Sequence, residues 1–133
     1  MTTVEPTLEQ LTALQASPDQ GPVVMLNLLR FRDRATGIDA AEGITGEEAY
    51  ARYGTEVSRY LERAGGRVLL ALTPQESVIG PAAGEWDLVL AVHYPSRAAF
   101  LGMIADPEYL AVHGHRAAGV ADSRLVACAT LEA

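Results

Sequence analysis

The stretch Val23-Val24-Met25-Leu26-Asn27-Leu28-Leu29-Arg30-Phe31-Arg32 decides the fold that the sequence predicts. It follows a Gly-Pro pair at residues 21–22 and is apolar at most positions, which is typical of a buried β-strand. Alternate residues of a strand point to opposite faces of its sheet, and here both sets are largely apolar. The stretch therefore predicts a sheet with two apolar faces, each of which has to be covered.

Capping and chain-breaking residues divide the rest of the sequence into predicted elements. Thr7 and Thr45 each stand three residues before a glutamine or glutamate, which is the capping box that begins a helix. Gly65 ends the longer of these helices. The predicted elements are a helix after Thr7, a strand over 23–32, a loop over 33–46, a helix over 46–64, a strand over 68–72 that can continue over 76–79, a turn over 81–85, a strand over 86–94, two helices carrying residues 100–104 and 109–120, and a last strand over 124–131.

This order predicts an α+β domain of the ferredoxin-like kind, with βαββαβ connectivity and a four-stranded antiparallel sheet. We expect residues 1–20 to be an N-terminal helical extension and residues 21–133 to form the ferredoxin-like domain. Two helices cover only one face of such a sheet, so the second apolar face needs another cover. The simplest cover is the sheet of a second copy, which predicts a homodimer through sheet-to-sheet packing, with the N-terminal helix as the rival cover.

Composition limits the partners of the protein. The formal net charge is −7 and all ten basic residues are scattered arginines, which argues against nucleic-acid binding. The absence of lysine excludes Schiff-base chemistry. The longest apolar run is too short to cross a membrane and the first residues lack the features of a signal peptide, so we expect a cytoplasmic protein. Cys128, the single cysteine, excludes an internal disulfide and a multi-cysteine metal site.

Asn27 is the most informative single residue, because an amide inside an apolar strand has to find hydrogen-bond partners. It can orient a ligand carbonyl or stabilise an enolate, or it can satisfy a neighbouring loop, and the sequence leaves both open. Tyr50 and Tyr53 lie on the sheet-facing side of the longest predicted helix. Core packing is the simpler role for both, and a hydroxyl directed at a ligand beside Asn27 is the alternative. Trp86 opens a strand and suits a wall of the same cavity.

His113-Gly114-His115 resembles a metal-binding pair until helix geometry is considered. Residues two apart point about 200° apart around a helix, so the two imidazoles cannot share an ion, and we expect no metal. His113 and Arg116 are helical neighbours, so Arg116 can clamp a substrate carboxylate while His113 acts as general base. The simpler alternative pairs Arg116 with Glu108 or Asp122. His93, in a predicted strand, is a further expected ligand contact.

Several short motifs occur together in the order that a known family has. They are the strand over 23–29, Tyr50 and Tyr53, Gly65-Gly66-Arg67, Trp86-Asp87, Tyr94-Pro95-Ser96, Asp106-Pro107-Glu108-Tyr109 and Asp122-Ser123-Arg124-Leu125. Over residues 21–131 the chain resembles the family of domains of unknown function called DUF1330. The resemblance implies a dimeric α+β barrel, in which two ferredoxin-like sheets pack face to face, and implies no particular activity. The wider superfamily of such barrels includes cofactor-free monooxygenases, lactone isomerases and haem-dependent enzymes, an analogy of fold alone.

No phosphate loop, dinucleotide fingerprint or nucleophile elbow is present, so we expect no cofactor. The hypothesis is a homodimer with one apolar cavity per subunit, between sheet and helices, that binds a small carbonyl-bearing or aromatic metabolite, with cofactor-free isomerase or monooxygenase chemistry as one use of it. The alternative is a non-catalytic ligand-binding or stress-related module. The expected catalytic residues are Asn27, Tyr50, His113 and Arg116, and the expected ligand contacts are Tyr53, Trp86 and His93.

Overall fold

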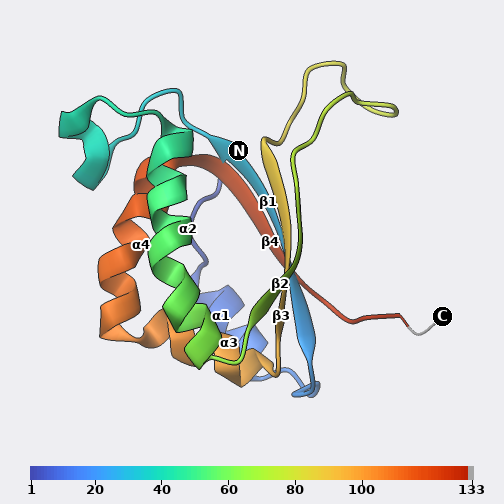
Figure 1. Ribbon diagram of the computed structural model, residues 1–133. Helices are drawn as coiled ribbons and strands as arrows, with labels where there is room; N and C mark the ends of the chain where they lie inside the picture. The colour runs from blue at the N-terminus through green and yellow to red at the C-terminus, as the bar shows by residue number, and fades with distance from the viewer. Residues whose placement is uncertain (132–133) are drawn as a thin grey trace.

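The computed structural model describes residues 1–131, which form one layer of helices against one sheet (Figure 1). The short 3-10 helix η1 lies inside the loop that the sequence predicts over 33–46. In chain order the elements are α1 (Leu8–Gln15), β1 (Val23–Phe31), η1 (Gly37–Glu42), α2 (Gly46–Arg63), β2 (Arg67–Leu72), β3 (Leu88–Tyr94), α3 (Arg97–Ala105), α4 (Pro107–Gly119) and β4 (Val120–Cys128).

The sheet has four strands in the order β2-β3-β1-β4, and every neighbouring pair is antiparallel. Helix α2 and the α3–α4 pair, which connect the strands, lie on one side of the sheet (Figure 1). This arrangement confirms the predicted ferredoxin-like α+β fold. Both expected capping boxes are present, with Gln10 completing the one at Thr7 and Glu48 the one at Thr45.

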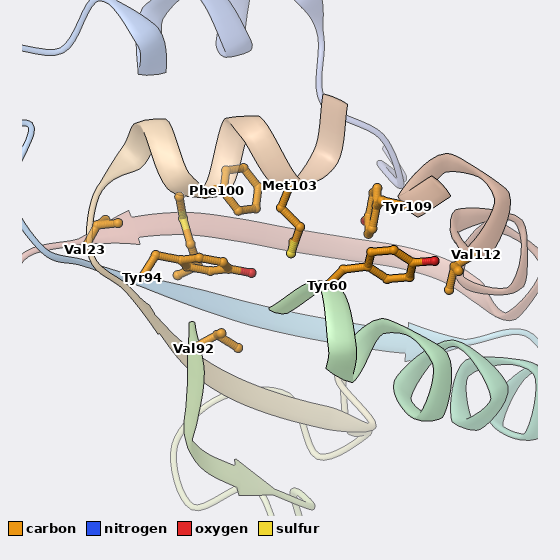
Figure 2. Packing of buried hydrophobic residues seen from close by; sticks show 9 residues of the cluster. Val23, Tyr60, Val92, Tyr94, Phe100, Met103, Tyr109 and Val112 are labelled. Carbon is orange, nitrogen blue, oxygen red and sulfur yellow. The ribbon is translucent and has the colours of Figure 1, made fainter. Parts of the chain in front are cut away.

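The main core lies between this sheet and the helices (Figure 2). Met25 of β1, Val92 of β3 and Phe100 of α3 are each less than a tenth exposed. The Tyr109 ring of α4 stands edge-on to the Tyr60 ring of α2, with the centroids 6.5 Å apart. Met25 and Val92 alternate along their strands with side chains that point to the other face of the sheet. The helices therefore bury only one face.

The other face of the sheet, here called the open face, carries a row of apolar side chains across all four strands. Leu26 of β1 pairs with Ala91 of β3 and Val126 of β4, and Ala91 pairs in turn with Leu70 of β2. Leu70 is 45% exposed and Val126 is 49% exposed. Because α1 contacts α3 on the helix side, the N-terminal helix does not cover this face, contrary to the rival prediction (Figure 1).

Three predicted boundaries differ from the structure. β3 begins at Leu88, because the Asp87 carboxylate accepts a hydrogen bond from the Phe31 N–H at 2.8 Å in place of a backbone carbonyl. The predicted continuation over 76–79 is not a strand, since residues 73–87 form a long loop that projects past the end of the sheet (Figure 1). β4 runs over Val120–Cys128 rather than over 124–131, and α4 stops at Gly119.

Three backbone segments meet where α4 gives way to β4. The Arg32 N–H donates to the Gly119 carbonyl at 2.8 Å, and the Gly46 N–H donates to the Arg32 carbonyl at 3.0 Å. A Cβ atom on Gly46 would lie 2.3 Å from the Arg32 carbonyl oxygen, and one on Gly119 would lie 2.4 Å from the Gly46 carbonyl oxygen. Only glycine allows this approach, so α2 begins and α4 ends at a fixed junction with β1.

Candidate functional site

Residues 3–5, here called the N-terminal strap, run along β4 on the helix side of the molecule. The Ser123 N–H donates to the Thr3 carbonyl at 2.7 Å, and the Thr3 N–H donates to the Asp122 carboxylate at 2.8 Å. The Ser123 hydroxyl also donates to the Thr3 carbonyl, at 3.0 Å. These hydrogen bonds hold the strap beside the last turns of α4, whose side chains it contacts.

Arg116 lies under the strap and is 9% exposed. Its Nη1 donates to the Val4 carbonyl at 2.7 Å, and its Nη2 lies 3.4 Å from the Ser123 hydroxyl. Both acceptors are neutral. Burial of a guanidinium is costly when no negative charge accompanies it. An anionic ligand would lower this cost for Arg116.

The two carboxylates that the sequence suggested as partners of Arg116 form ion pairs with other arginines. Glu108 lies 3.3 Å from Arg63, and Asp122 pairs with Arg30 and Arg124. Within residues 1–131, Arg116 has no carboxylate within ion-pair distance. The simpler alternative, in which Arg116 belongs to a salt bridge with Glu108 or Asp122, is therefore wrong.

His113 lies one turn before Arg116 on α4 and is also bound to the strap. Its Nε2 lies 2.8 and 2.9 Å from the two oxygens of the Glu5 carboxylate. Its Nδ1 lies 3.5 Å from the Tyr109 hydroxyl. The imidazole thus stands between an exposed carboxylate and a buried phenol.

Three tyrosines complete the surroundings of Arg116. The Tyr53 and Tyr109 hydroxyls are 3.1 Å apart, and the Tyr50 ring lies 5.4 Å from the Tyr53 ring. Burial raises the pKa of Tyr50 to about 12 and also raises the pKa values of Tyr53 and Tyr109, while the nearby charge of Arg116 acts in the opposite direction. At neutral pH these phenols are therefore protonated and able to donate hydrogen bonds.

We call this group of side chains the Arg116 cluster: Tyr50, Tyr53, Tyr109, His113 and Arg116. It combines a guanidinium, an imidazole and neutral phenols beside the strap. Such groups stabilise carboxylate and carbonyl oxygens, and the strap supplies one of each, from Glu5 and Val4. The cluster can therefore hold an anionic oxygen ligand and polarise a carbonyl beside it.

Asn27 shares the helix side of the sheet with this cluster, because it lies two residues from the buried Met25 and two from the buried Leu29 along β1 and so points to the same face. It pairs with Leu90 and Leu125 across the sheet. Within the described chain its side-chain amide makes one hydrogen bond, to the Met25 carbonyl at 3.4 Å. Its role as a catalytic residue remains a prediction.

Trp86 and His93 lie apart from the cluster. The Arg124 guanidinium stands over the Trp86 ring, 5.2 Å from its centroid, and Arg124 pairs with Leu28 on the open face. His93 pairs with Val24 of β1. Val24 lies two residues from Leu26 and points to the open face, so His93 points there too. The structure does not bring either residue to Arg116.

A second polar group fixes η1 to the helices. Asp39 is 1% exposed and lies 2.8 Å from His115 Nδ1 and 2.9 Å from Arg52 Nη1, while His115 Nε2 lies 3.3 Å from Glu56. His113 and His115 therefore face different partners, as helix geometry requires. This group anchors the loop over 33–45 and explains the polarity of its residues.

Two hollows lie among the helices, rather than between the sheet and the helices, where the sequence led us to expect a cavity. One of about 200 Å³ is lined by α2, α3 and Asp106, and one of about 550 Å³ is lined by α2 and α4. Neither is lined by a residue of the Arg116 cluster. The space beside Arg116 is filled by the strap.

Tyr109 and the strap are the parts of the site that the sequence did not predict. Tyr109 stands one helical turn before His113, so its spacing was a usable signal. Val4 and Glu5 had no such signal, because their partners lie more than a hundred residues away in the chain.

Comparison with known proteins identifies the family. The model of the family described as domain of unknown function DUF1330 matches residues 38–129. The chain belongs to the DUF1330 family. Comparison of this chain with curated proteins found no match.

Solved structures support both the family and the fold. A crystal structure of a protein of unknown function from Rhodopseudomonas palustris is 40% identical, with a TM-score of 0.92 and 100% of both chains covered. A DABB-family protein with a ferredoxin-like fold from Mesorhizobium loti is 13% identical, with a TM-score of 0.53 over 85% of this chain and all of that one. A candidate antibiotic biosynthesis monooxygenase from Bacteroides thetaiotaomicron is 20% identical, with a TM-score of 0.54 over 84% of this chain and 91% of that one. The last two show the fold alone. No helix in the described part of this DUF1330 protein has the length and hydropathy needed to cross a bilayer.

Proposed function

We propose that the protein binds a small carboxylate-bearing metabolite at the Arg116 cluster. The observation that carries this proposal is the buried guanidinium of Arg116, whose acceptors are a backbone carbonyl and a hydroxyl. A ligand carboxylate would neutralise this charge with the bidentate geometry that arginine favours. The surrounding tyrosine rings offer apolar walls that suit a carbonyl-bearing or aromatic body.

Cofactor-free catalysis is the chemistry that this arrangement supports. His113 is placed to take a proton from a carbon next to a ligand carbonyl, and Arg116 or the neutral Tyr50 phenol is placed to stabilise the enolate oxygen. Isomerases and monooxygenases that need no cofactor begin with such a step. The analogy with the monooxygenase of similar fold is one of architecture alone.

We infer that the working unit is a homodimer that joins two open faces. The row Leu26, Ala91, Leu70 and Val126 gives each copy an apolar surface that its own helices leave uncovered. Val78 and Ile79, which are 92% and 96% exposed on the loop that projects past the sheet, extend the apolar surface available to a partner. Two such sheets can pack face to face about 10 Å apart.

Thermal-shift measurements with benzoate as probe, and with the uncharged benzamide as its control, test the binding proposal. We expect benzoate to raise the melting temperature of the wild type and benzamide to leave it unchanged. Arg116→Met should abolish this shift, Arg116→Lys should reduce it, and Arg63→Met, which removes an exposed arginine, should preserve it. Without ligand, Arg116→Met should leave the free energy of unfolding within about 1 kcal/mol of the wild type, because it removes a buried charge that lacks a counter-ion.

A non-catalytic module is the alternative function, and the filled space beside Arg116 is the observation in its favour. In that case Arg116 would serve to anchor the strap. Arg116→Met would then lower the free energy of unfolding by more than about 2 kcal/mol, and benzoate would bind to none of the variants. That result would overturn the binding proposal.

A further inference from the structure

The strap presents two oxygen acceptors to the Arg116 cluster in one short covalent unit. The Val4 carbonyl accepts from Arg116 at 2.7 Å, and the Glu5 carboxylate lies 2.8 Å from His113 Nε2. The atoms that join these two groups are the peptide nitrogen, Cα, Cβ and Cγ of Glu5. The cluster is therefore occupied by an acylamino group with a carboxylate at the end of a short aliphatic chain.

Little apolar burial holds the strap in this position. Thr3 and Glu5 are exposed, and Val4 is only half-buried. The Glu5 carboxylate is 51% exposed, whereas the His113 side chain that it contacts is 24% exposed. Segments with few buried apolar contacts open at low free-energy cost, so the strap can leave while the cluster beneath it stays in place.

The donors under the strap belong to rigid elements. Arg116 and His113 lie on α4, and Ser123 lies on β4 next to the glycine junction that fixes both elements. These donors are preorganised, and the strap that accepts from them buries little apolar surface. Such an arrangement is typical of a ligand site in which a segment of the chain takes the place of the ligand.

We propose that the strap occupies the position of the ligand, and that the ligand is a small compound with a carboxylate and a carbonyl separated as they are in the Val4–Glu5 unit. A free ligand has no tether and can lie in the reverse direction, with its carboxylate on Arg116 and its carbonyl at His113, so that the guanidinium gains a counter-ion. The simplest compound with this skeleton is 4-acetamidobutanoate, in which the same chain of one nitrogen and three carbons joins an acetyl carbonyl to a carboxylate. The inference rests on the proposed function and names the chemical class of its ligand, an acylamino or oxo carboxylate.

The tether makes the strap a competitor of such a ligand. A segment linked to its own site has an effective concentration on the order of millimolar, and a free ligand has to displace it. Removal of the Glu5 carboxylate weakens this competition and leaves Arg116 and His113 intact. Glu5→Gln should therefore raise the affinity for an external carboxylate by about tenfold.

Calorimetric titration of the full chain with 4-acetamidobutanoate tests this inference, with 4-acetamidobutanamide as the uncharged control. The variants are Glu5→Gln, Glu9→Gln, which removes an exposed carboxylate of α1, and the double variant Glu5→Gln/Arg116→Met. We expect Glu5→Gln to bind the acid about tenfold more tightly than the wild type and Glu9→Gln, and the double variant to lose binding. Hydrogen exchange of the Ser123 amide, which is bonded to Thr3, should become faster when the acid binds the wild type.

The other outcomes of these titrations distinguish a failure of the strap proposal from a failure of the proposed function at Arg116. Equal affinities of wild type and Glu5→Gln, with unchanged exchange at Ser123, would overturn the role of the strap and leave Arg116-dependent binding in place. Binding of benzoate but not of 4-acetamidobutanoate by Glu5→Gln would overturn the ligand class. Failure of both acids to bind any variant would overturn the proposed function itself.

Discussion

At the residue scale, the buried tyrosines are the groups whose charge state differs most between the folded and unfolded chain. Burial is the largest cause of the raised pKa values of Tyr50, Tyr53, Tyr94 and Tyr109. Tyr53 and Tyr109 also share a hydrogen bond, which only a protonated phenol can donate. The folded chain therefore keeps phenol protons that the unfolded chain releases.

We expect stability to fall as the pH rises above 10, the ordinary pKa of tyrosine. Above that pH the unfolded state binds fewer protons than the folded state, so each protected tyrosine lowers the free energy of unfolding by up to about 1.4 kcal/mol per pH unit. The stabilisation is complete below pH 10 and is lost as the pH approaches the raised pKa, which for Tyr50 is about 12. Urea unfolding between about pH 8 and 11 measures it. Tyr53→Phe should give a shallower slope, and a constant free energy from about pH 9 to 11 would contradict the prediction.

Among the candidate site residues, helical spacing was enough to predict that His113 and Arg116 share one helix face. His113 and Arg116 are three residues apart on α4, and both contact the strap as neighbours on one helix face. The partners of Arg116 could not be predicted in the same way. Glu108 and Asp122 are near in sequence, but each has another arginine, because the strap rather than a carboxylate approaches Arg116.

At the scale of elements, the junction of Gly46, Gly119 and Arg32 sets the register between two helices and two strands. Its hydrogen bonds join the end of β1 to the start of α2 and to the turn between α4 and β4. The backbones meet so closely that a methyl group has no room. The position of the Arg116 cluster depends on this junction, because α4 and β4 carry Arg116 and Ser123.

Gly46→Ala should destabilise the protein, whereas Gly54→Ala should stabilise it. The new Cβ at position 46 would meet backbone atoms that cannot move without separating the elements, and overpacking of this kind costs about 2–3 kcal/mol. The same substitution at position 54 of α2 meets no atom within 4 Å and gains about 0.5–1 kcal/mol of helix propensity. Denaturant unfolding of both variants compares two alanines in one helix. Equal effects would show that the junction tolerates a side chain.

The sequence predicted the elements well where local chemistry determines them. The capping boxes at Thr7 and Thr45 began α1 and α2 as expected, and the apolar run from Val23 became β1. The start of β4 was missed because Asp122 and Ser123 are polar and resemble a turn. They fit a buried strand only because the distant Thr3 satisfies their hydrogen bonds, and no local pattern records that contact.

At the scale of the whole molecule, one face of the sheet is buried by helices and the other is apolar and bare. Alternate residues of β1 point to opposite faces of the sheet, and both sets are largely apolar. This pattern predicted that the face left uncovered by the helices would be apolar. The position of α1 beside α3 had no comparable signal, since its Leu8, Leu11 and Leu14 suit either face of a sheet.

Leu70→Glu should convert the proposed dimer into monomers. A carboxylate in the central row of the open face would have to be desolvated between two sheets, which costs several kcal/mol. Leu110→Glu is the matched control, because Leu110 is 56% exposed on α4 and Leu70 is 45% exposed on the open face. Analytical ultracentrifugation should find a dimer for the wild type and Leu110→Glu. A monomeric wild type at high concentration would disprove the assembly.

The contact between Thr3 and Ser123 has a consequence for the order in which the protein matures during translation. Residues 3–5 are synthesised more than a hundred residues before β4, their partner. Arg116 also emerges late, only shortly before β4. The strap therefore stays unattached until β4 has been synthesised, and during that time Arg116 and His113 lack the acceptors that Val4 and Glu5 supply.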